Sequence, residues 1–382
     1  MKIFDAVVLG GGPSGAATAL CLARSGCSVA LAEQSNYASA RVGETLPPAI
    51  QPVLAQLGVW ERFMEQKPAP SVGTRSAWGG PELRSNDFIF NPYGPGWCVA
   101  RNRFDALLAQ CAAAGGAQVY SGAANTRIVK RAGIWRVDLS RANGSCRSFR
   151  AGFVVDATGR RAAFARKQGS RRILLDSLIG ASVVLPSPDY RSSGYTLIEA
   201  VENGWWYSAV LPDSKLIVVY MTDGDIYASG RNDGMGANIE RTMHTRLRID
   251  ARGLVRSQTR LTAANTSWLD RVAGPDWLAV GDAAMALDPL SGQGIYKAIQ
   301  CGIRAADAIL RRRNASDATP FRRYADSLCR DRGSSLSLRY RYYDMERRWR
   351  GFPFWRRRHR SWSEFLSGLG EAVRKERSFS PF

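Results

Sequence analysis

The sequence predicts an α/β protein in which a nucleotide-binding domain carries an inserted, mainly antiparallel β-sheet domain and a helical C-terminal extension. Three observations lead to this fold class. A glycine-rich turn follows an apolar strand at the N-terminus, a second apolar strand with a glycine-rich helix start lies near residue 290, and a long alternating β pattern separates them. With 382 residues, the chain is long enough for two packed lobes.

The N-terminal turn has the spacing Gly10-x-Gly12-x-x-Gly15. It follows an apolar β-prone run over residues 5–9 and opens an Ala/Leu-rich helical run that ends near Ser25. The first two glycines permit a tight turn and the close approach of a pyrophosphate, and Gly15 lets helix and strand pack closely. The free N–H groups and the positive dipole end of the helix favour bound phosphates.

The next apolar run, residues 27–32, ends at Glu33. A carboxylate at this position accepts hydrogen bonds from the two ribose hydroxyls of an adenosine. The order strand, glycine turn, helix, strand, acid is typical of the Rossmann-like unit that binds a dinucleotide. The alternative, a glycine turn without a ligand, is disfavoured because the acid stands at the expected distance.

The loop after this unit carries Arg41, Gly43 and Glu44. These residues are placed to meet the phosphate or the ring edge of a cofactor, although a plain surface loop explains them equally well. The Pro47-Pro48 pair that follows predicts a helix over about residues 49–58, because proline is tolerated at the first turn of a helix.

The segment over residues 71–97 mixes aromatic residues with Gly and Pro, which indicates short strands and an excursion towards a substrate lobe. Arg103-Phe104-Asp105 then opens a helix, residues 106–114, that returns to the first lobe. From about residue 174 to 262 the pattern alternates, and residues 204–212 and 215–221 form a predicted hairpin.

The predicted domains follow from these shifts in composition. We expect a discontinuous nucleotide-binding domain, a substrate domain inserted into it, and a basic helical extension. Their boundaries are residues 1–75, 98–173 and 265–312 for the first, 76–97 and 174–264 for the second, and 313–382 for the third.

The second glycine-rich region distinguishes between dinucleotides. Gly281-Asp282 ends an apolar strand, and Pro289–Gly294 opens a helix that starts at Ile295. Two such sites in one lobe suit a long cofactor, and FAD fits, with its adenosine and pyrophosphate at residues 10–33, its ribitol at Gly281-Asp282 and its isoalloxazine at Pro289–Gly294. The helix dipole there favours an anionic reduced flavin.

Composition excludes several classes of protein. No run approaches the roughly 20 apolar residues of a membrane span, and the first strand directly follows Met1-Lys2, so we expect no signal peptide and a cytoplasmic location. Seven scattered cysteines without a CxxC pair indicate reduced thiols. Only His244 and His359 are histidines, which argues against a histidine metal site or a Ser–His pair, and we expect no metal.

The net charge of +20 permits three kinds of partner: nucleic acid, an anionic membrane surface or an acidic protein. The segment from Arg311 onward carries +11 of it. A basic face without a partner is the plain alternative. Nucleic acid is disfavoured, because the aromatic residues form no RNA-binding motif and a flavin would go unexplained.

The two glycine-rich regions, together with Arg103-Phe104-Asp105 and Asp156-Ala157-Thr158-Gly159, resemble the para-hydroxybenzoate-hydroxylase-like flavoprotein monooxygenases and halogenases over roughly residues 1–310. The resemblance implies that Glu33 binds the adenosine ribose, Arg41 and Arg103 approach the phosphates and ribitol, and Asp282 binds the ribitol. The FAD-binding residues that it implies are Gly10, Gly12, Pro13, Ser14, Gly15, Glu33, Gln34, Arg41, Gly43, Arg103, Ala123, Gly159, Asp282, Pro289, Gly292, Gln293 and Gly294.

Within that family, residues 43–48, Trp78-Gly79, residues 204–207 and residues 346–357 look like the flavoproteins that mature tryptophylquinone enzymes. These include the lysine-oxidase and glycine-oxidase maturases and the tryptophan hydroxylase of quinohemoprotein amine dehydrogenase. The resemblance implies hydroxylation of a tryptophan in a precursor protein or peptide, with O2 as co-substrate, through a flavin C4a-hydroperoxide. An acidic precursor would be steered to the basic rim.

Two departures bear on the chemistry. Halogenases carry a catalytic lysine and a Trp-x-Trp-x-Ile-Pro motif, whereas this chain has Arg75 in the comparable region and Trp205-Trp206-Tyr207 at the second. Single-component hydroxylases carry a Cys-Asp-Gly motif that is absent here, so electrons come either from NAD(P)H directly or through a separate flavin reductase. The alternatives are a small-molecule or carrier-tethered aromatic hydroxylase, then a halogenase or a prenyl reductase, and a flavin-containing scaffold without turnover.

For the reaction itself, Glu44 is the candidate catalytic carboxylate, with a structural loop cap as its alternative, and Asp288 is a comparable acid that caps the following helix if it has no chemical role. The candidate substrate cleft is aromatic, although ordinary packing explains part of the set. Its members are Trp78, Trp97, Trp205, Trp206 and Tyr207.

Overall fold

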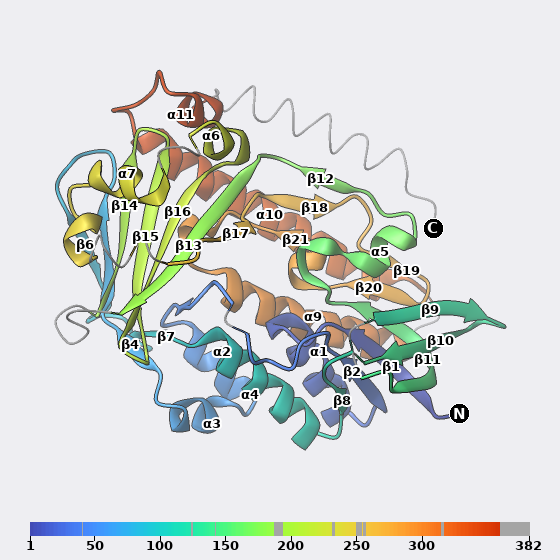
Figure 1. Cartoon of the computed structure of the whole chain (residues 1–382). Coiled ribbons are helices and arrows are strands. Elements are labelled where there is room, and N and C mark those ends of the chain that lie inside the picture. The colour runs from blue at the N-terminus through green and yellow to red at the C-terminus, as the bar shows by residue number, and fades with distance from the viewer. Residues whose placement is uncertain are drawn as a thin grey trace.

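The computed structural model of the chain describes residues 1–39, 41–123, 125–141, 143–186, 194–230, 234–249, 254, 257–314 and 317–359. Two lobes lie against each other. Figure 1 shows four helices on one side and the strands of a large sheet on the other: α1 (Pro13–Arg24), α2 (Ile50–Gln56), α4 (Arg101–Ala114) and α9 (Gly294–Asn314). Helix α10 (Thr319–Met345) runs past that sheet. The predicted α/β fold class is confirmed.

An eight-stranded sheet forms the centre of the nucleotide-binding lobe, with the order β19-β20-β11-β1-β2-β8 and a β9–β10 hairpin joined to β11. Strands β20, β11, β1, β2 and β8 run parallel, as expected for buried apolar strands connected by helices. The strands are β1 (Ile3–Leu9), β2 (Val29–Ala32), β8 (Gln118–Tyr120), β9 (Asn125–Arg131), β10 (Ile134–Ser140), β11 (Cys146–Asp156), β19 (Ala273–Gly274) and β20 (Trp277–Ala279).

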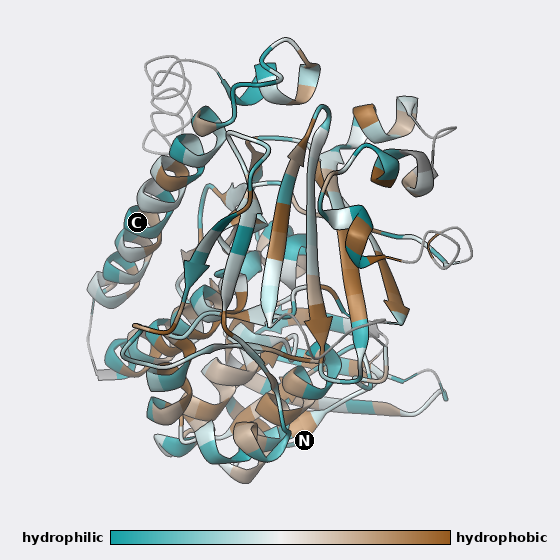
Figure 2. Cartoon of the chain, turned by 90° about the vertical axis from the view of Figure 1, so that its left-hand side faces the viewer, coloured by the Kyte–Doolittle hydropathy of each residue, from teal (hydrophilic) through white to brown (hydrophobic). Residues whose placement is uncertain are grey.

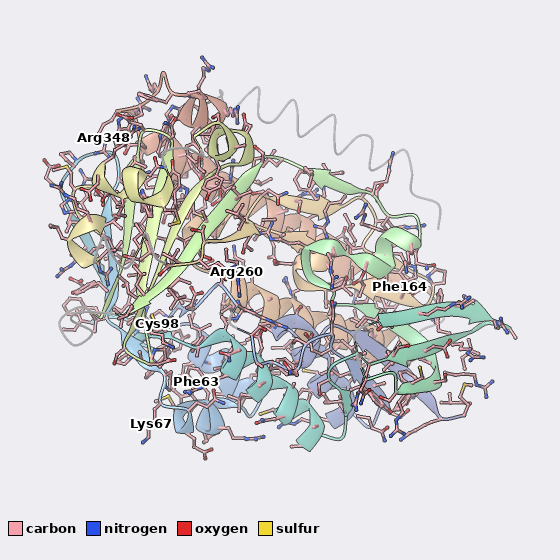
Figure 3. All side chains as sticks on the ribbon, viewed as in Figure 1. Phe63, Lys67, Cys98, Phe164, Arg260 and Arg348 are labelled. Atoms are coloured by element: carbon pink, nitrogen blue, oxygen red, sulfur yellow. The ribbon has the colours of Figure 1, made fainter. Side chains whose placement is uncertain are left out.

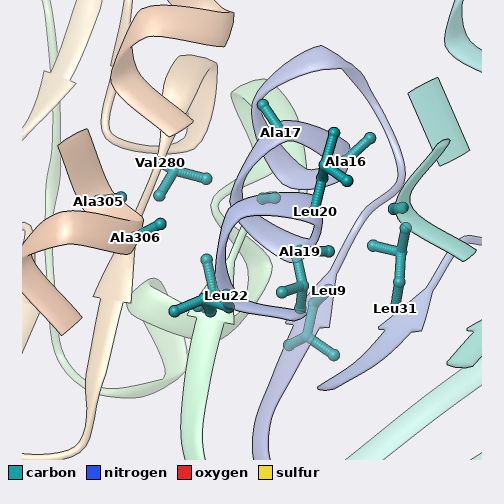
Figure 4. Packing of buried hydrophobic residues seen from close by; sticks show 14 of the residues in the cluster. Leu9, Ala16, Ala17, Ala19, Leu20, Leu22, Leu31, Val280, Ala305 and Ala306 are labelled. Atoms are coloured by element: carbon teal, nitrogen blue, oxygen red, sulfur yellow. The ribbon is translucent and has the colours of Figure 1, made fainter. Parts of the chain in front are cut away.

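The helices of this lobe cover the parallel sheet. They are α1 (Pro13–Arg24), α2 (Ile50–Gln56), α3 (Trp60–Glu65), α4 (Arg101–Ala114), α5 (Ala163–Lys167) and α9 (Gly294–Asn314), with short 3-10 turns η1 (Gly159–Arg161), η3 (Gly281–Ala283) and η4 (Pro289–Ser291). Small side chains let α1 and α9 approach closely, since a Cβ on Gly302 would lie 2.4 Å from the Ser14 carbonyl oxygen. Figure 4 shows Ala16, Ala17 and Leu20 of α1 in this core, with Val280 and Ala305 close by.

A seven-stranded sheet forms the second lobe, in the order β17-β13-β16-β15-β14-β5-β6. Its neighbours are antiparallel except for β14 and β5, which are parallel. The strands are β5 (Gly73–Ala77), β6 (Arg84–Asp87), β13 (Leu178–Pro186), β14 (Tyr195–Val201), β15 (Gly204–Leu211), β16 (Lys215–Asp223) and β17 (Arg260–Ala263). Figure 2 shows hydrophobic residues along its central strands, and the predicted hairpin corresponds to β15 and β16. Because β5 pairs with β14, the expected boundary after residue 75 falls inside a strand of this sheet.

The described residues also form two small sheets and three further short helical segments. The sheets have the orders β3-β7-β4 and β12-β18-β21. The remaining elements are β3 (Thr45–Leu46), β4 (Ala69–Ser71), β7 (Gly96–Cys98), β12 (Arg172–Leu174), β18 (Ser267–Leu269), β21 (Met285–Ala286), α6 (Gly224–Ser229), α7 (Gly234–Glu240) and η2 (Thr245–Arg248).

The C-terminal extension is part of the packed structure as far as residue 359. Helix α10 (Thr319–Met345) packs against α9, and α11 (Pro353–Arg358) follows it. Trp355 is fully buried and its indole N–H donates to the Val201 carbonyl at 2.9 Å. The buried Arg358 pairs with Asp223 at 2.7 Å. The expected extension is therefore packed onto both lobes with Arg332 and Arg358 buried, whereas most of its other described arginines are exposed, and residues 360–382 lie outside the described residues.

Two further properties concern thiols and membranes. All seven cysteines are free. Across the described part of the chain, no helix combines the length and apolar character needed to cross a membrane.

Candidate active site

A cavity of about 1030 Å³ is lined by residues of both lobes. Most of the predicted site residues meet there. Those that line the cavity are Gly10, Gly12, Pro13, Ser14, Glu33, Gln34, Arg41, Gly43, Glu44, Ala123, Gly159, Trp205, Tyr207, Asp282, Pro289, Gly292, Gln293 and Gly294. Five predicted residues are not among the lining residues: Gly15, Arg103, Trp78, Trp97 and Trp206.

The N-terminal glycine turn forms one end of the cavity. Gly10 has a φ of +108°, and a Cβ there would lie 2.2 Å from the Ala157 carbonyl oxygen, so only glycine fits. A Cβ on Gly15 would lie 2.0 Å from the Gly10 carbonyl oxygen, which explains why Gly15 packs the helix without lining the cavity. A Cβ on Gly12 would meet nothing within 4 Å, so this turn leaves room for a ligand against its backbone.

Glu33 is held as an ionised acceptor beside this turn. Its carboxylate accepts the Gly11 N–H at 2.6 Å and the Ser35 hydroxyl at 2.6 Å, and it pairs with Arg41 at 2.7 Å. Burial by itself would raise its pKa, but the hydrogen bonds from Ser35 and Gly11 and the charge of Arg41 lower it. Arg41 also pairs with Asp105 at 2.9 Å, so two carboxylates hold its guanidinium at the cavity wall.

The second glycine region forms another part of the wall. Gly281 has a φ of +57° and a Cβ there would lie 2.4 Å from the Ser14 hydroxyl oxygen, which ties the two glycine regions together. The next residue, Asp282, lines the cavity, and its carboxylate lies 3.6 Å from Arg160 Nε. Cβ atoms on Gly292 and Gly294, at the start of α9, would meet nothing within 4 Å. The backbone at this helix N-terminus is therefore open to a ligand.

Asp288 caps the η4 turn, which lies between Gly281 and Gly292. One carboxylate oxygen accepts the Leu290 N–H at 3.0 Å. The other accepts the Arg339 Nε and the Tyr343 hydroxyl, each at 3.0 Å. The capping alternative therefore fits this acid, which also joins the loop to helix α10.

The start of α4 places Arg101, and not Arg103, at the cavity. Arg101 donates to the carbonyl oxygens of Val42 and Gly43 at 2.9 and 3.0 Å, and its Nε lies 3.3 Å from Asp105. Arg103 is exposed, because two residues along a helix turn a side chain by roughly 200°. The expectation that Arg103 approaches the cofactor is wrong in this respect.

Glu44 lies at the cavity in an unusual state for a carboxyl group. It is 2% exposed, and no described residue forms a hydrogen bond of normal geometry with either carboxyl oxygen, although the Gly43 and Glu44 N–H groups are close enough to lower its pKa slightly. Burial raises its pKa from 4.5 to about 7, against the opposing charge of Arg101. A carboxyl group with this pKa holds or releases a proton near neutral pH.

Two ionisable groups beside Glu44, the Tyr207 hydroxyl and the Cys98 thiol, stay neutral near pH 7. Tyr207 forms a hydrogen bond with the Thr45 hydroxyl, and burial together with the charge of Glu44 raises the pKa of Tyr207 well above its usual value. Burial likewise raises the pKa of the Cys98 thiol to about 12. Cys98 is labelled at the base of the large sheet in Figure 3. Within this group, Glu44 is the one that titrates near neutral pH.

Two of the five predicted aromatic residues line the cavity. They are Trp205 and Tyr207, which lie two residues apart on β15 and so share one face of the sheet. Trp78 stands behind them, with its ring centroid 6.3 Å from that of Trp205. The indole N–H of Trp205 donates to the Tyr343 hydroxyl at 3.1 Å, which fixes the cavity wall to helix α10.

Trp206 and Trp97 serve in packing, contrary to the predicted cleft. Trp206 points to the opposite face of β15, where it stacks on Tyr220 at 4.9 Å between ring centroids. Trp97 packs edge-on against Trp60 and Phe63 in the nucleotide-binding lobe. Because successive side chains of a strand point to opposite faces, placing Trp205 at the cavity predicts that Trp206 lies on the other face of the sheet.

Sequence reasoning missed several lining residues. Val219 and Met221 on β16 and Gly180 on β13 line the cavity. They pair across the sheet with Tyr207, Trp205 and Met221 respectively, so strand register is the signal that identifies them. Thr262 on the edge strand β17 and Lys297 on α9 also line it, and no pattern in the sequence distinguishes them.

The lining residues fit an extended dinucleotide cofactor. Two helix N-termini have open space beside their backbone, one at Gly12 and the other at Gly292 and Gly294. A Cβ added to any of these glycines would occupy that space. An ionised acid stands by the first turn, and apolar residues of the sheet lie across the cavity. This donor set suits the adenosine, phosphate and flavin parts of FAD.

Comparison with known proteins agrees with this fit. The model of a family described as FAD binding domain matches residues 4–313. A putative FAD-dependent oxidoreductase, LodB of Marinomonas mediterranea, is 28% identical over 94% of this chain and 98% of its own length. Other relatives are halogenating enzymes, among them a tryptophan 2-halogenase of Chondromyces crocatus, 24% identical over 79% of this chain and 60% of its own length, and a flavin-dependent halogenase of Armillaria mellea, 26% identical over 80% and 67%.

Two solved structures share the fold. The chondrochloren halogenase CndH superposes with a TM-score of 0.83 at 21% identity, covering 97% of this chain and 89% of its own. The peptidyl tryptophan dihydroxylase QhpG, described as essential for tryptophylquinone cofactor biogenesis, superposes with a TM-score of 0.74 at 25% identity, covering 95% and 79%.

Proposed function

This chain belongs to the FAD-binding-domain family, and from that premise we propose that it hydroxylates a tryptophan ring in a precursor polypeptide during maturation of a tryptophylquinone cofactor. The coarser statement, that it is an FAD-dependent oxidoreductase, holds independently of the substrate. The observation that carries the proposal is the shared cavity: the glycine turns, the aromatic face of the sheet and the buried Glu44 all line it.

The chemistry divides between cofactor and protein. When bound and reduced, a flavin activates O2 and supplies one oxygen atom to an electron-rich ring. The protein binds the cofactor through its glycine turns and Glu33. Trp205, Val219 and Met221 provide an apolar wall that excludes water and positions a flat ring.

Glu44 is the proposed proton-holding group of the reaction. Its carboxyl oxygens are buried at the cavity, no described residue forms a hydrogen bond of normal geometry with them, and burial raises its pKa to about 7. It therefore retains a proton near neutral pH that it can donate to a departing oxygen. An indole ring is electron-rich, so the substrate side of the reaction does not require a strong base.

The relatives support the peptide substrate. LodB aligns along nearly the whole of both chains, and QhpG acts on a peptidyl tryptophan according to its description. The runner-up is hydroxylation of a carrier-tethered or free aromatic compound, because one relative is a brominase of a pyrrole held on a peptidyl carrier protein. Halogenation is disfavoured by Arg75, whose guanidinium lies over the Tyr195 ring at 4.2 Å and does not line the cavity.

Coexpression with a candidate precursor polypeptide, followed by intact mass measurement, tests the proposal. We expect the tryptophan-containing polypeptide to gain one or two oxygen atoms, about 16 or 32 Da, and to gain none when the enzyme carries Gly12→Val. The electron donor is tested in the same system by supplying NADH or NADPH with and without a flavin reductase. An unmodified polypeptide, together with hydroxylation of a free aromatic compound, would replace the proposal by the runner-up.

A further inference from the structure

Strand β17 forms an open edge of the seven-stranded sheet. All four of its residues, Arg260 to Ala263, are exposed. It pairs with β13 on one side, in the register Gly180 opposite Thr262, and no described strand pairs with its other side. An open edge of this kind offers main-chain groups to another extended chain.

The direction of the free main-chain groups follows from the ladder. The Ala264 N–H donates to the Leu178 carbonyl at 2.9 Å. Residues along an antiparallel strand alternate between bonding to the partner and facing away, so Thr262 and Arg260 also bond to β13. The N–H and C=O groups of Leu261 and Ala263 therefore point outward, and Leu261 is 54% exposed.

This edge lies at the cavity. Thr262 and Ala263 both line it. Thr262 shares the cavity face of the sheet with Gly180 and Met221, which it reaches through the cross-strand register. A strand added beside β17 would place every second side chain on that same face. One ring of the added strand could then enter the cavity while its main chain stays outside.

Exposed cations lie on this edge and on the cavity that it borders, although acids such as Asp282 line the cavity as well. Arg260 stands on β17 itself and is labelled in Figure 3, next to the space between the lobes. Arg161 and Lys167 are exposed and line the same cavity from the nucleotide-binding lobe. The opposite edge strand of the sheet, β6, carries both Arg84 and Asp87, so its charges balance, and it does not line the cavity. The edge at the cavity therefore favours acidic chains, and the other edge provides a comparison.

We propose that the outer edge of β17 docks an extended, acidic segment of the substrate polypeptide, which joins the sheet as an additional strand and directs one tryptophan into the cavity. This mode of recognition obtains affinity from main-chain hydrogen bonds and selectivity from alternate side chains. The inference rests on the proposed function, because it supplies the binding site for a polypeptide substrate.

A pair of methylated peptides tests the hydrogen bonds. The probe is a fluorescein-labelled peptide of about 12 residues, rich in Glu and Thr, with one central tryptophan, added to the FAD-loaded full-length protein. Two versions of the peptide carry N-methyl groups on every second residue. In the first version the tryptophan and the residues two and four positions away from it are methylated. In the second version the residues next to the tryptophan, and every second residue from them, are methylated. Because the tryptophan must face the cavity, only one set of N–H groups can bond to β17. We expect one version to bind like the unmodified peptide and the other to bind at least tenfold more weakly. The version that fails reports whether the added strand is antiparallel or parallel.

Protein variants test the place of docking. Leu261→Pro removes an outward N–H and leaves the β13 ladder intact, whereas Leu261→Ala keeps that N–H. The matched control is Ser85→Pro on β6, where the Phe88 N–H bond to the Val72 carbonyl at 2.8 Å implies that the Ser85 N–H also faces outward. We expect a loss of at least tenfold in peptide affinity for Leu261→Pro and less than threefold for the other two. Flavin absorbance and the melting temperature report whether each variant remains folded.

The outcomes separate docking from catalysis. Equal binding of both methylated peptides, failure of the unmodified peptide to bind, or an equal loss in Leu261→Pro and Ser85→Pro would each overturn the docking site. If Leu261→Pro does not fold, the methylated pair decides alone. A bound peptide that gains no oxygen under turnover contradicts the proposed function and leaves the docking site standing.

Discussion

Replacing Glu44 by glutamine changes how stability depends on pH. Burial raises the Glu44 pKa from 4.5 to about 7, so the folded protein keeps a proton that the unfolded chain releases. The associated stability is fully present below pH 4.5 and is lost as pH rises through 7. Once the group is ionised, the difference amounts to about 3 kcal/mol, because each pH unit between the two pKa values contributes about 1.4 kcal/mol.

Urea unfolding of the FAD-free protein at pH 5 and pH 8 measures this effect. Between pH 5 and pH 8, we expect the unfolding free energy of the wild type to fall more than that of Glu44→Gln. The difference between the two decreases should be somewhat less than about 3 kcal/mol, because Glu44 is already partly ionised in the unfolded chain at pH 5. The other titrating groups are common to both proteins and cancel in the comparison. Glu61→Gln, at an exposed position on α3, is the control and should follow the wild type. Identical pH dependence in the wild type and Glu44→Gln would refute the assignment of a raised pKa.

The same substitution bears on turnover. If Glu44 must hold a proton, oxygen insertion by the wild type slows above pH 7, and Glu44→Gln reduces the rate at least tenfold and removes this dependence. Rates at saturating peptide over pH 6–8 give both quantities. A Glu44→Gln enzyme with the wild-type rate and pH profile would assign Glu44 to a structural role.

Three further predictions concern the cofactor and the C-terminal region. Gly12→Ala should leave the melting temperature of the FAD-free protein unchanged but weaken FAD binding at least tenfold, measured by flavin fluorescence, because the added Cβ occupies open space. Arg101→Ala should weaken FAD binding several-fold and Arg103→Ala should not, since only the former lines the cavity; equal effects would contradict the geometry. Arg358→Ala should cost about 3 kcal/mol in urea unfolding, because the buried Asp223 carboxylate loses its buried partner and keeps only the half-exposed Arg357, whereas Arg357→Ala leaves the Arg358 pair intact and should cost less than about 1 kcal/mol.

The sequence predicted best what short-range geometry determines. The glycine spacing at residues 10–15 and the apolar runs around it specify a turn, a helix and two strands within 33 residues, and the structure has them there. The same holds for the β15–β16 hairpin and for the start of α9. At each of these places, the local pattern of apolar residues and the local requirement for a turn residue favour the same structure.

Long-range packing determined what the sequence did not predict. Glu44 is buried because β3 pairs with β7, about 50 residues further along the chain, and local composition left a surface loop equally acceptable. Trp205 and Trp206 are adjacent in sequence and point to opposite faces of the sheet. Which of them lines the cavity depends on which face of the sheet borders the cavity. Arg101 and Arg103 differ in the same way by their position around a helix.

The distribution of charge also changes once the C-terminal region is seen folded. From its composition, that region offers a basic surface for an acidic partner. In the structure, Arg358 is buried against Asp223, and Arg339 is held between Asp176 and Asp288 at 3.1 and 3.0 Å. Such matched pairs contribute little to the field outside the molecule, because each positive charge lies beside a negative one.

Attraction of an acidic polypeptide then depends on the exposed cations, which include Arg323, Arg330 and Arg350 of the C-terminal region as well as residues nearer the cavity. These nearer residues are Arg161 and Lys167 at the cavity and Arg260 on the adjoining strand edge. Charge in such places acts mainly on the rate of association and is screened over about 10 Å at 0.1 M salt. Replacing Arg161, Lys167 and Arg260 together should therefore slow peptide association and reduce its salt dependence, while the buried arginines of the C-terminal region determine stability.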